Sequence, residues 1–349
     1  MLKELQLSNE QEARAMSLHK KAIVADMSLT GSSAHPVLPR NGKTYYERMT
    51  AAGLTIASHT LGHAEPDFHN GLEDANIHNR LVAQNPDKYM LVTRSEHFRQ
   101  AKEEGKIGLV LTFQNATQLE DDWLNYLPVF HALGVRVIGP TYNTTNLLGS
   151  GCLEPVDNGL TGYGRQVIRA MGHIGMLVDL SHTGDRTCRE TLEVAQDPVL
   201  LTHANPRALN ASPRNKPDDI LKAVAASGGV VGVVAWNVLC MTKPNVQPTI
   251  LDLADHIDYL VNLIGVDHVG LGSDMNENFD ALPVKSNFAE VYGWMMEGVR
   301  NMTEPVGFGS VDDYPNLTRV LVKRGYSDSD ILKILGENYM RVAKQVWDR

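Results

Sequence analysis

The chain has 349 residues, of which 43% are hydrophobic and 21% charged, and its formal net charge is −9. This composition is ordinary for a soluble globular protein, and because the sequence has no continuous basic run we expect no nucleic-acid partner. The three cysteines lack CxxC spacing, which argues against a disulfide framework or a thiolate zinc site and indicates the cytoplasm. No apolar stretch approaches the ~18 residues that cross a bilayer, and the N-terminus lacks the apolar core of a signal peptide, so we expect no membrane association.

The predicted elements begin with a polar, amphipathic helix over residues 1–21. Short apolar runs of the kind that form buried parallel strands follow it, at residues 22–29, 54–59, 107–114, 135–142, 175–182, 198–203, 229–236 and 268–274. Segments with the apolar spacing of helices lie between several of these runs, at residues 119–133, 164–173, 185–195, 218–227 and 253–264. Glycines suited to helix C-caps precede several strands, namely Gly134, Gly175, Gly228 and Gly265. Eight such units predict an α/β fold, a (β/α)8 TIM-like barrel.

A doubly wound open sheet is the alternative architecture. It would need a glycine-rich phosphate turn after the first strand, and residues 26–32 contain no GxGxxG. We therefore favour the barrel. Residues 275–315 are expected to form a long loop region, and the tail from residue 316 is expected to form closing helices, so that residues 1–349 make a single domain.

The predicted strands end in polar residues. Two of them close on His182 and His203, and the last closes on Asp274. Barrel enzymes take their reactive groups from the C-terminal strand ends, so we expect these side chains to converge. The other strand ends supply Asp26, Ser28, His59, Gln114, Asn115, Tyr142, Asn143, Trp236 and Asn237. Removing so many polar groups from water without partners is costly. The sequence therefore predicts a ligand, a metal or a water network at the mouth of the barrel, where the C-terminal strand ends meet.

Two imidazoles and a carboxylate form a set that suits one divalent metal ion, with zinc as the first candidate. Such an ion would acidify a bound water, and Asp274 could accept the proton of that water. A single strand-terminal histidine is more often a hydrogen-bonded core residue. The pair His182 and His203, on neighbouring strands, favours ligation.

Other polar residues have weaker patterns. His59, His63 and His69 fall in a histidine-rich stretch that could be a lid or a solvated loop, and we expect no chemistry from it. Arg214 precedes a predicted helix, where its guanidinium could clamp a substrate carboxylate or pair with Asp218 or Asp219.

Five segments carry a resemblance to a known family. GLTGYGRQVIRAMGHIGMLVDLSHTG, PVLLTHANPRALNASPRNKPDDIL, ASGGVVGVV, IGVDHVGLGSD and GENYMRV resemble, in order and spacing, the membrane dipeptidase (renal dipeptidase, peptidase M19) family of the amidohydrolase superfamily. The resemblance covers roughly residues 105–345 and implies a distorted barrel with two zinc ions that hydrolyses dipeptides. It also implies that His182 and His203 hold the second zinc, that Asp274 handles the catalytic proton, and that Arg214 binds the substrate carboxylate.

The chain departs from the family pattern at the metal centre. Ser28 and Thr30 stand where the family has the HxD ligands of the first zinc, and Gln114, followed by Asn115, stands where it has the bridging glutamate. Tyr142 replaces a histidine that the family uses in the transition state. Without an anionic bridge two close dications repel each other, so we expect a single-metal site or a metal-free pocket.

Three functions remain open on these grounds. The first is a dipeptidase-like hydrolase with one metal, cleaving an amide or related C–N bond in a small carboxylate-bearing substrate, such as a dipeptide or an amino-acid derivative. The second is a metal-independent isomerase or lyase, and the third is an inactive small-molecule binder. In each case we expect substrate contacts from Arg214, Tyr142, Asn143, Gln114 and Asn115, and a homodimer.

Overall fold

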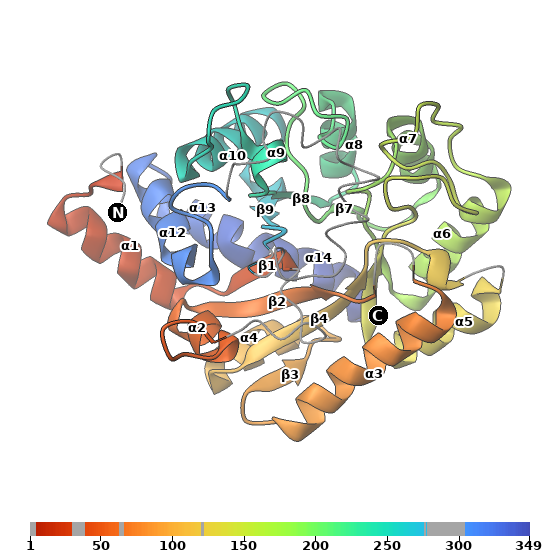
Figure 1. Cartoon of the computed structure of the whole chain (residues 1–349), viewed down its shortest axis with the longest axis horizontal. Coiled ribbons are helices and arrows are strands. Elements are labelled where there is room, and N and C mark those ends of the chain that lie inside the picture. The colour runs from red at the N-terminus through yellow and green to blue at the C-terminus, as the bar shows by residue number, and fades with distance from the viewer. Residues whose placement is uncertain (1–4, 30–38, 63–65, 120–121, 276, 278–303) are drawn as a thin grey trace.

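The computed structural model describes residues 5–29, 39–62, 66–119, 122–275, 277 and 304–349. Parallel strands alternate with helices along the chain, and the two chain ends lie on different sides of the molecule (Figure 1). Most of the predicted loop region 275–315 falls outside these residues.

A ring of parallel strands forms the centre of the fold, and all eight predicted strands contribute to it. They are β1 (Val24–Leu29), β2 (Leu54–Thr60), β4 (Ile107–Phe113), β5 (Val135–Ile138), β6 (Leu177–Val178), β7 (Leu200–Leu201), β8 (Val230–Val233) and β9 (Val269–Leu271). Continuous ladders join β1 to β6 and β7 to β9. Single bridges, Asp179 to Leu200 and Leu29 to Met275, link the two arcs at both seams. The predicted (β/α)8 barrel is therefore confirmed, in a distorted form with short strands.

One further strand, β3 (Tyr89–Leu91), was not predicted and pairs with β4 outside the ring. Its sequence, Tyr-Met-Leu, is apolar but only half-buried, and this run is shorter than those from which the strands were predicted.

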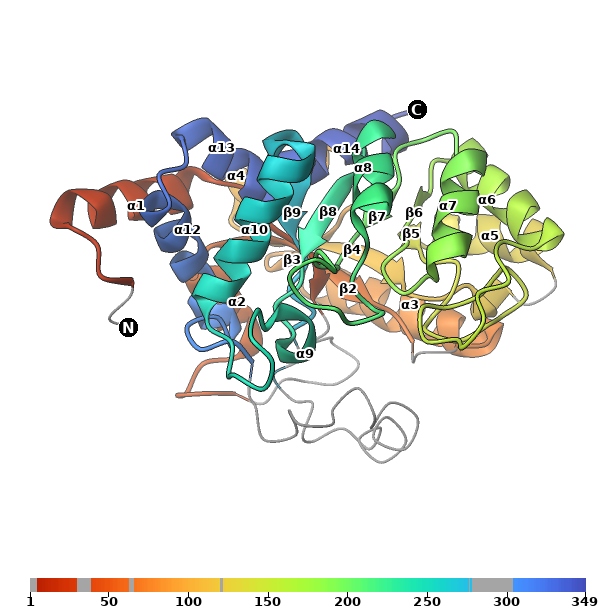
Figure 2. The same ribbon diagram turned by 90° about the horizontal axis from the view of Figure 1, so that it is seen from above.

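Helices surround the ring, and Figure 2 shows α6, α7, α8 and α10 in succession around β6 to β9. The helices are α1 (Asn9–Lys21), α2 (Tyr45–Ala51), α3 (Phe68–Gln84), α4 (Glu96–Glu104), α5 (Trp123–Ala132), α6 (Gly162–Ile174), α7 (Asp185–Val194), α8 (Asp218–Ala226), α9 (Asn237–Cys240), α10 (Ile250–Ile264), α12 (Tyr314–Lys323), α13 (Asp328–Leu332) and α14 (Asn338–Trp347). Short 3-10 turns occur at η2 (Thr117–Leu119), η3 (Val266–His268) and η6 (Val311–Asp313), and a π turn at η7 (Lys333–Glu337). The N-terminal helix, the five helices between strands and the closing helices were predicted. Gly175 ends α6 with a φ of 76°, in the left-handed conformation of a helix C-cap.

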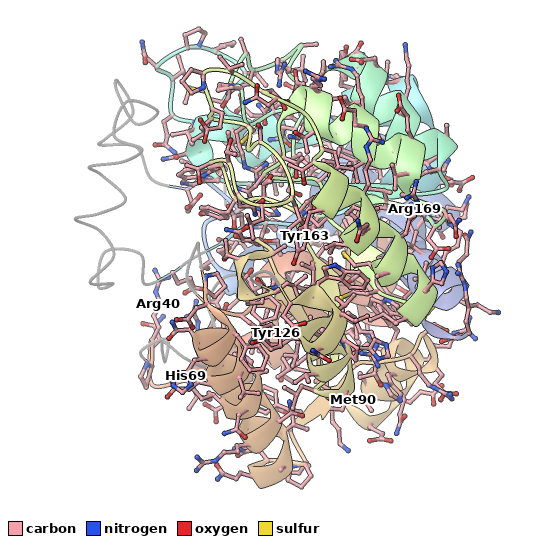
Figure 3. The ribbon with its side chains drawn as sticks, turned by 90° about the vertical axis from the view of Figure 1, so that its right-hand side faces the viewer. Arg40, His69, Met90, Tyr126, Tyr163 and Arg169 are labelled. Atoms are coloured by element: carbon pink, nitrogen blue, oxygen red, sulfur yellow. The ribbon has the colours of Figure 1, made fainter. Side chains whose placement is uncertain are left out.

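The histidine-rich stretch differs from its predicted loop. His59 lies within β2, and His69 lies on the exposed face of α3 (Figure 3), while His63 is outside the described residues. Asp67 begins α3 by accepting a hydrogen bond from the Asn70 amide at 2.7 Å. Its fully buried residues are Gly71, Ala75 and His78, which are small or polar, so the apolar period of this helix is weak in the sequence.

The C-terminal helix closes one end of the barrel. Val346 of α14 packs in the same cluster as strand residues such as Leu200 and Val230. Arg341 of the same helix donates to the carbonyl oxygens of Gly228 and Asp267, which precede β8 and β9. The closed end is therefore the N-terminal end of the strands, and the C-terminal end remains for a site. No helix in the described ranges is long and apolar enough to span a membrane.

Candidate active site

Two histidines meet at the C-terminal end of the barrel. His182 follows β6 and His203 follows β7, and both side chains are buried. Their Nε2 atoms lie 3.0 Å apart, with ring centroids 4.9 Å apart. The predicted approach of these two imidazoles is thus present in the structure.

Close strand packing holds His203 in this place. A Cβ atom on Gly272 would lie 1.7 Å from the Thr202 carbonyl oxygen, and one on Gly232 would lie 2.1 Å from the same atom. Both distances are far below any van der Waals contact, so β8 and β9 can approach the end of β7 only because these positions are glycine.

The histidine pair is uncharged at neutral pH. Burial lowers the pKa of His182 and of His203 well below the ordinary range, and the nearby charge of Arg214 lowers both further. A neutral imidazole nitrogen is the form that binds a metal ion.

Asp274 stands beside the pair. Its φ of 56° is left-handed, and its amide donates to the Ser28 carbonyl oxygen at 2.8 Å. Its carboxyl group accepts hydrogen bonds from the side chains of Ser28 and Gln114, and burial raises its pKa to about 6 while Arg214 opposes that shift. The Gln114 amide nitrogen lies 3.3 Å from Ser28 Oγ and 3.5 Å from His203 Nε2. Gln114 therefore links Asp274 to the histidine pair.

The loop after β5 packs on the other side of the pair. The ring of Tyr142 stacks on His182, with centroids 4.0 Å apart and planes at 25°. Asn143 has a φ of 58°, and its amide oxygen lies 2.8 Å from His182 Nδ1. The side-chain oxygen of Asn115 accepts a hydrogen bond from Asn146 at 2.8 Å. Their roles in substrate binding remain predictions.

Arg214 is buried next to these groups. Its Nη1 donates to the Ser181 carbonyl oxygen, and its Nη2 has no hydrogen-bond partner among the described residues. Asp218 instead accepts from Tyr259, and Asp219 pairs with Arg189 at 2.7 Å. The alternative in which Arg214 pairs with either aspartate is therefore wrong, and a buried donor is left for another acceptor.

The spacing of the two imidazoles can be compared with that of two ligands on one metal ion. Two imidazole nitrogens on one tetrahedral zinc, each about 2.0–2.1 Å from it, lie about 3.3 Å apart, close to the separation of this pair. A binuclear centre needs anionic ligands where the chain has neutral Gln114 and Ser28, and Thr30 is outside the described residues. Within the described ranges no group of three His, Cys, Asp or Glu is arranged to hold an ion. A third ligand would have to come from water, the substrate or another residue type.

Sequence reasoning passed over three polar residues near the site. Asp179 accepts hydrogen bonds from Ser181 and Thr202, and its only sequence signal is its place in the DLSH stretch. The buried ammonium of Lys216 donates to the Thr183 carbonyl oxygen. Burial and the charge of Asp274 raise the pKa of Glu304 to about 8, and this residue lies in a segment with no periodic pattern.

Two predicted strand-end groups lie away from the histidines. Asp26 accepts hydrogen bonds from the Ser273 amide at 3.0 Å and from the Tyr314 hydroxyl, which ties β1 to the end of β9 and to α12. His59 points outward and packs edge-on against His78 of α3, with centroids 5.5 Å apart. His59 was expected in a lid or a solvated loop, but it is buried between β2 and α3, apart from the histidine pair.

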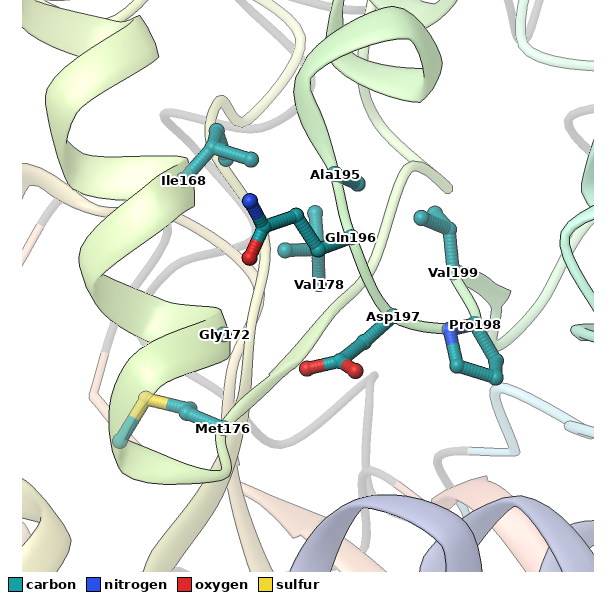
Figure 4. A pocket seen from close by; sticks show the side chains of 9 residues that line it. All are labelled: Ile168, Gly172, Met176, Val178, Ala195, Gln196, Asp197, Pro198 and Val199. Carbon is teal, nitrogen blue, oxygen red and sulfur yellow. The ribbon is translucent and has the colours of Figure 1, made fainter.

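A small pocket lies at the opposite end of the barrel (Figure 4). Its empty volume is about 220 Å³, and it is lined by Ile168, Gly172, Met176, Val178, Ala195, Gln196, Asp197, Pro198 and Val199. Met176 and Pro198 precede β6 and β7, so this pocket is at the N-terminal strand ends and separate from the histidine pair.

Known proteins resemble this chain in sequence over most of its length. Residues 42–348 match the family model of membrane dipeptidase, peptidase family M19. The chain is 29% identical to dipeptidase tcpJ of Claviceps purpurea over 271 residues, which are 77% of this chain and 58% of that protein. The chain thus spans less than two thirds of that relative's length.

Solved structures share the fold over nearly the whole chain. An amidohydrolase from Pseudomonas aeruginosa superposes with a TM-score of 0.84 at 33% identity, covering 96% of this chain and 99% of its own. A metallopeptidase from Rhodobacter sphaeroides, liganded with a phosphinate mimic of the dipeptide L-Ala-D-Ala, superposes with a TM-score of 0.75 at 19% identity, covering 93% of this chain and 100% of its own. By the match over residues 42–348, the chain belongs to the membrane dipeptidase family, peptidase M19, and is a hydrolase of that type.

Proposed function

We propose that this protein is a dipeptidase-like hydrolase that cleaves an amide or related C–N bond in a small substrate with a free carboxylate, such as a dipeptide or an amino-acid derivative. The observation that carries the proposal is the meeting of His182 and His203, with Nε2 atoms 3.0 Å apart, beside Asp274 and the buried, unpartnered Nη2 of Arg214. Membership of the M19 family supports the same reaction class.

His182 and His203 would hold a single divalent ion, with zinc as the first candidate. When bound, such an ion supplies Lewis acidity and a more acidic water. Burial keeps the two imidazoles neutral, so they need not lose protons before binding.

Arg214 would anchor the substrate. Its Nη2 lacks an acceptor in the described protein, and a guanidinium matches a carboxylate with paired hydrogen bonds. Binding of the carboxylate there would place the neighbouring C–N bond near Asp274, within a site that also presents Gln114 and Tyr142.

Asp274 would carry the proton of the reaction. A pKa of about 6 leaves it mostly ionised at neutral pH, so it can accept a proton from the attacking water and then deliver that proton to the leaving nitrogen. Gln114 and Ser28 hold its carboxyl group in position. Asn143 and Asn115 complete the polar lining of the mouth.

The test combines metal content with turnover. Purified protein is stripped with a chelator, reloaded with one equivalent of zinc, manganese or cobalt, and assayed on dipeptides and on N-acyl amino acids. We expect hydrolysis that depends on the added metal and is lost in H182A and H203A. Full activity in protein shown by elemental analysis to be metal-free would contradict the single-metal mechanism.

A second candidate is favoured by the neutral side chains of Gln114 and Ser28 at the expected anionic ligand positions. In it the pocket works without a metal, as an isomerase or lyase, or binds a small carboxylate without turnover. Chelator-resistant product formation would identify the enzyme, and thermal stabilisation by a carboxylate ligand with no product in any metal would identify the binder.

The assembly and location of the protein are part of the same proposal. We propose a cytoplasmic homodimer, and light scattering on purified protein would test the dimer directly.

A further inference from the structure

The carboxyl group of Asp179 lies buried behind the histidine pair and accepts four hydrogen bonds. Its Oδ1 atom accepts from the Ser181 amide at 3.0 Å, the Ser181 hydroxyl at 2.6 Å and the Thr202 amide at 2.8 Å. Its Oδ2 atom accepts from the Thr202 hydroxyl at 2.6 Å. The side chain is 3% exposed, so solvent does not compete for these contacts.

The direction of these bonds decides where the protons of His203 lie. The single hydroxyl proton of Thr202 is directed to Asp179, so Thr202 Oγ1 has only lone pairs left for its other neighbour. That neighbour is His203 Nδ1, at 2.7 Å. The imidazole must therefore donate from Nδ1, and its Nε2 keeps a bare lone pair.

His182 is arranged in a parallel way by a different residue. Its Nδ1 lies 2.8 Å from the side-chain oxygen of Asn143, an acceptor, so its Nε2 also keeps a lone pair. The two lone pairs, 3.0 Å apart, repel each other, and the Gln114 amide, 3.5 Å from His203 Nε2, offsets this repulsion less than a cation between the rings would. The protein thus holds both rings in the tautomer that favours a shared cation.

We propose that Asp179, acting through Thr202, is a positioning residue that fixes His203 in the Nδ1–H tautomer and keeps Nε2 free for a cation. This inference rests on the single-metal site proposed above. Hydrogen-bond partners behind a metal-binding histidine typically contribute 10–100-fold to metal affinity, so the effect should be measurable.

The D179N variant tests this role because the geometry indicates how its hydrogen bonds rearrange. Oδ1 receives two backbone N–H groups, which can only donate, so the amide oxygen of Asn must remain at that position. The NH2 group then faces Thr202 Oγ1 and donates to it. The Thr202 hydroxyl proton then turns toward His203 Nδ1 at 2.7 Å, which is closer than Ser181 Oγ at 3.2 Å. Nδ1 becomes the acceptor, and the ring proton moves to Nε2.

The experiment compares D179N and T202V with two controls. T202S keeps the hydroxyl group and should behave as the natural chain. S181A removes a hydroxyl that donates to Asp179 and also contacts the Thr202 hydroxyl and the His203 backbone amide, but not the His203 ring, so it controls for the loss of buried hydrogen bonds that do not reach the ring.

Two readouts are measured for each variant. Long-range 1H–15N spectra of histidine-labelled, chelator-treated protein report which ring nitrogen of His203 carries the proton, with H203Q as the assignment reference. Zinc affinity is measured by competition with a chromophoric chelator. We expect D179N to move the proton to Nε2, and both D179N and T202V to lose about 10–100-fold in zinc affinity, with T202S and S181A within about threefold.

Two results would overturn the inference: Nε2–H in the natural chain, or an unchanged tautomer in D179N. If the tautomer changes as expected but no variant, including the natural chain, binds zinc, the positioning role stands and the single-metal function fails. If D179N does not fold, the contrast between T202V and T202S decides on both readouts.

Discussion

At the scale of single residues, the first prediction concerns Asp274 and the pH dependence of the reaction. Its pKa is raised to about 6 because the carboxyl group is buried, and it must be ionised to accept a proton. We expect kcat/KM to rise with pH through about 6 and then level off, and D274N to lower kcat by about 10²–10⁴-fold. D219N, at an exposed ion pair away from the mouth, serves as the control. A flat pH profile between 4.5 and 7.5 would exclude Asp274 as the base.

A second prediction concerns Arg214, which should affect both the substrate specificity and the pH dependence of the reaction. R214M should lower kcat/KM for dipeptides by about 10²-fold or more, because a buried guanidinium–carboxylate contact is lost, and it should barely affect the corresponding C-terminal amides. The charge of Arg214 also lowers the pKa of Asp274, so the acid limb of the pH profile should move to higher pH in R214M. R207K, at a pair with Asp185, is the matched control. Equal losses on acids and amides would contradict a carboxylate-binding role.

At the scale of elements, a buried ion network joins α2 to the chain beyond β9. Arg48 of α2 contacts Glu277 at 2.6 Å and Asp312 of η6 at 2.8 Å. Glu277 also accepts from the Val311 amide at 2.8 Å. Glu277 comes three residues after Asp274, so the network fixes the chain that leaves the site.

We expect that substituting Arg48 alone lowers the free energy of unfolding more than substituting Arg48 and Glu277 together. R48M leaves the Glu277 carboxylate buried without its cation, which should lower the free energy of unfolding by about 3–5 kcal/mol. R48M/E277Q should recover most of that loss, because the only charge left without Arg48 is then Asp312, whose side chain is half exposed to solvent. The exposed pair of Arg94 and Glu96 gives the control, where R94M should cost less than about 1 kcal/mol. Urea unfolding at pH 7.5 measures all three, and equal losses in the single and double variants would contradict the account.

At the scale of the whole molecule, the sequence predicts the ring of strands and the histidine pair well because each depends on a local pattern. His182, His203 and Asp274 each close an apolar run, and strand order alone brings such ends to one mouth. Helix α3 was missed because its buried face consists of small and polar residues. Asp179 was missed as a site residue because its role depends on hydrogen bonds to a neighbouring strand end, which no spacing in one segment reveals.

Whole-molecule stability should depend on pH chiefly through buried histidines. Burial lowers the pKa of His59 to about 3 and that of His256 to about 4, so in this range the unfolded chain binds more protons than the folded chain. Their contribution is complete above the ordinary histidine value of about 6.5 and is lost as pH falls toward 3. The pKa values of His182 and His203 are also well below the ordinary range, so these residues act in the same direction. Asp26 and Asp274, with pKa values raised to about 6, and Glu304, raised to about 8, act oppositely.

Four buried histidines therefore act against three carboxyl groups, and the free energy of unfolding should increase from pH 4 to 6.5. Neither ring nitrogen of His59 has a hydrogen-bond partner among the described residues, so H59L removes the titration without breaking a bond. We expect H59L to reduce the slope of unfolding free energy against pH by up to about 1.4 kcal/mol per pH unit. H69L, on the exposed face of α3, should keep the natural slope. Urea unfolding at steps of half a pH unit measures both variants. Parallel curves of unfolding free energy against pH for H59L and the natural chain would show that His59 does not contribute to the acid sensitivity.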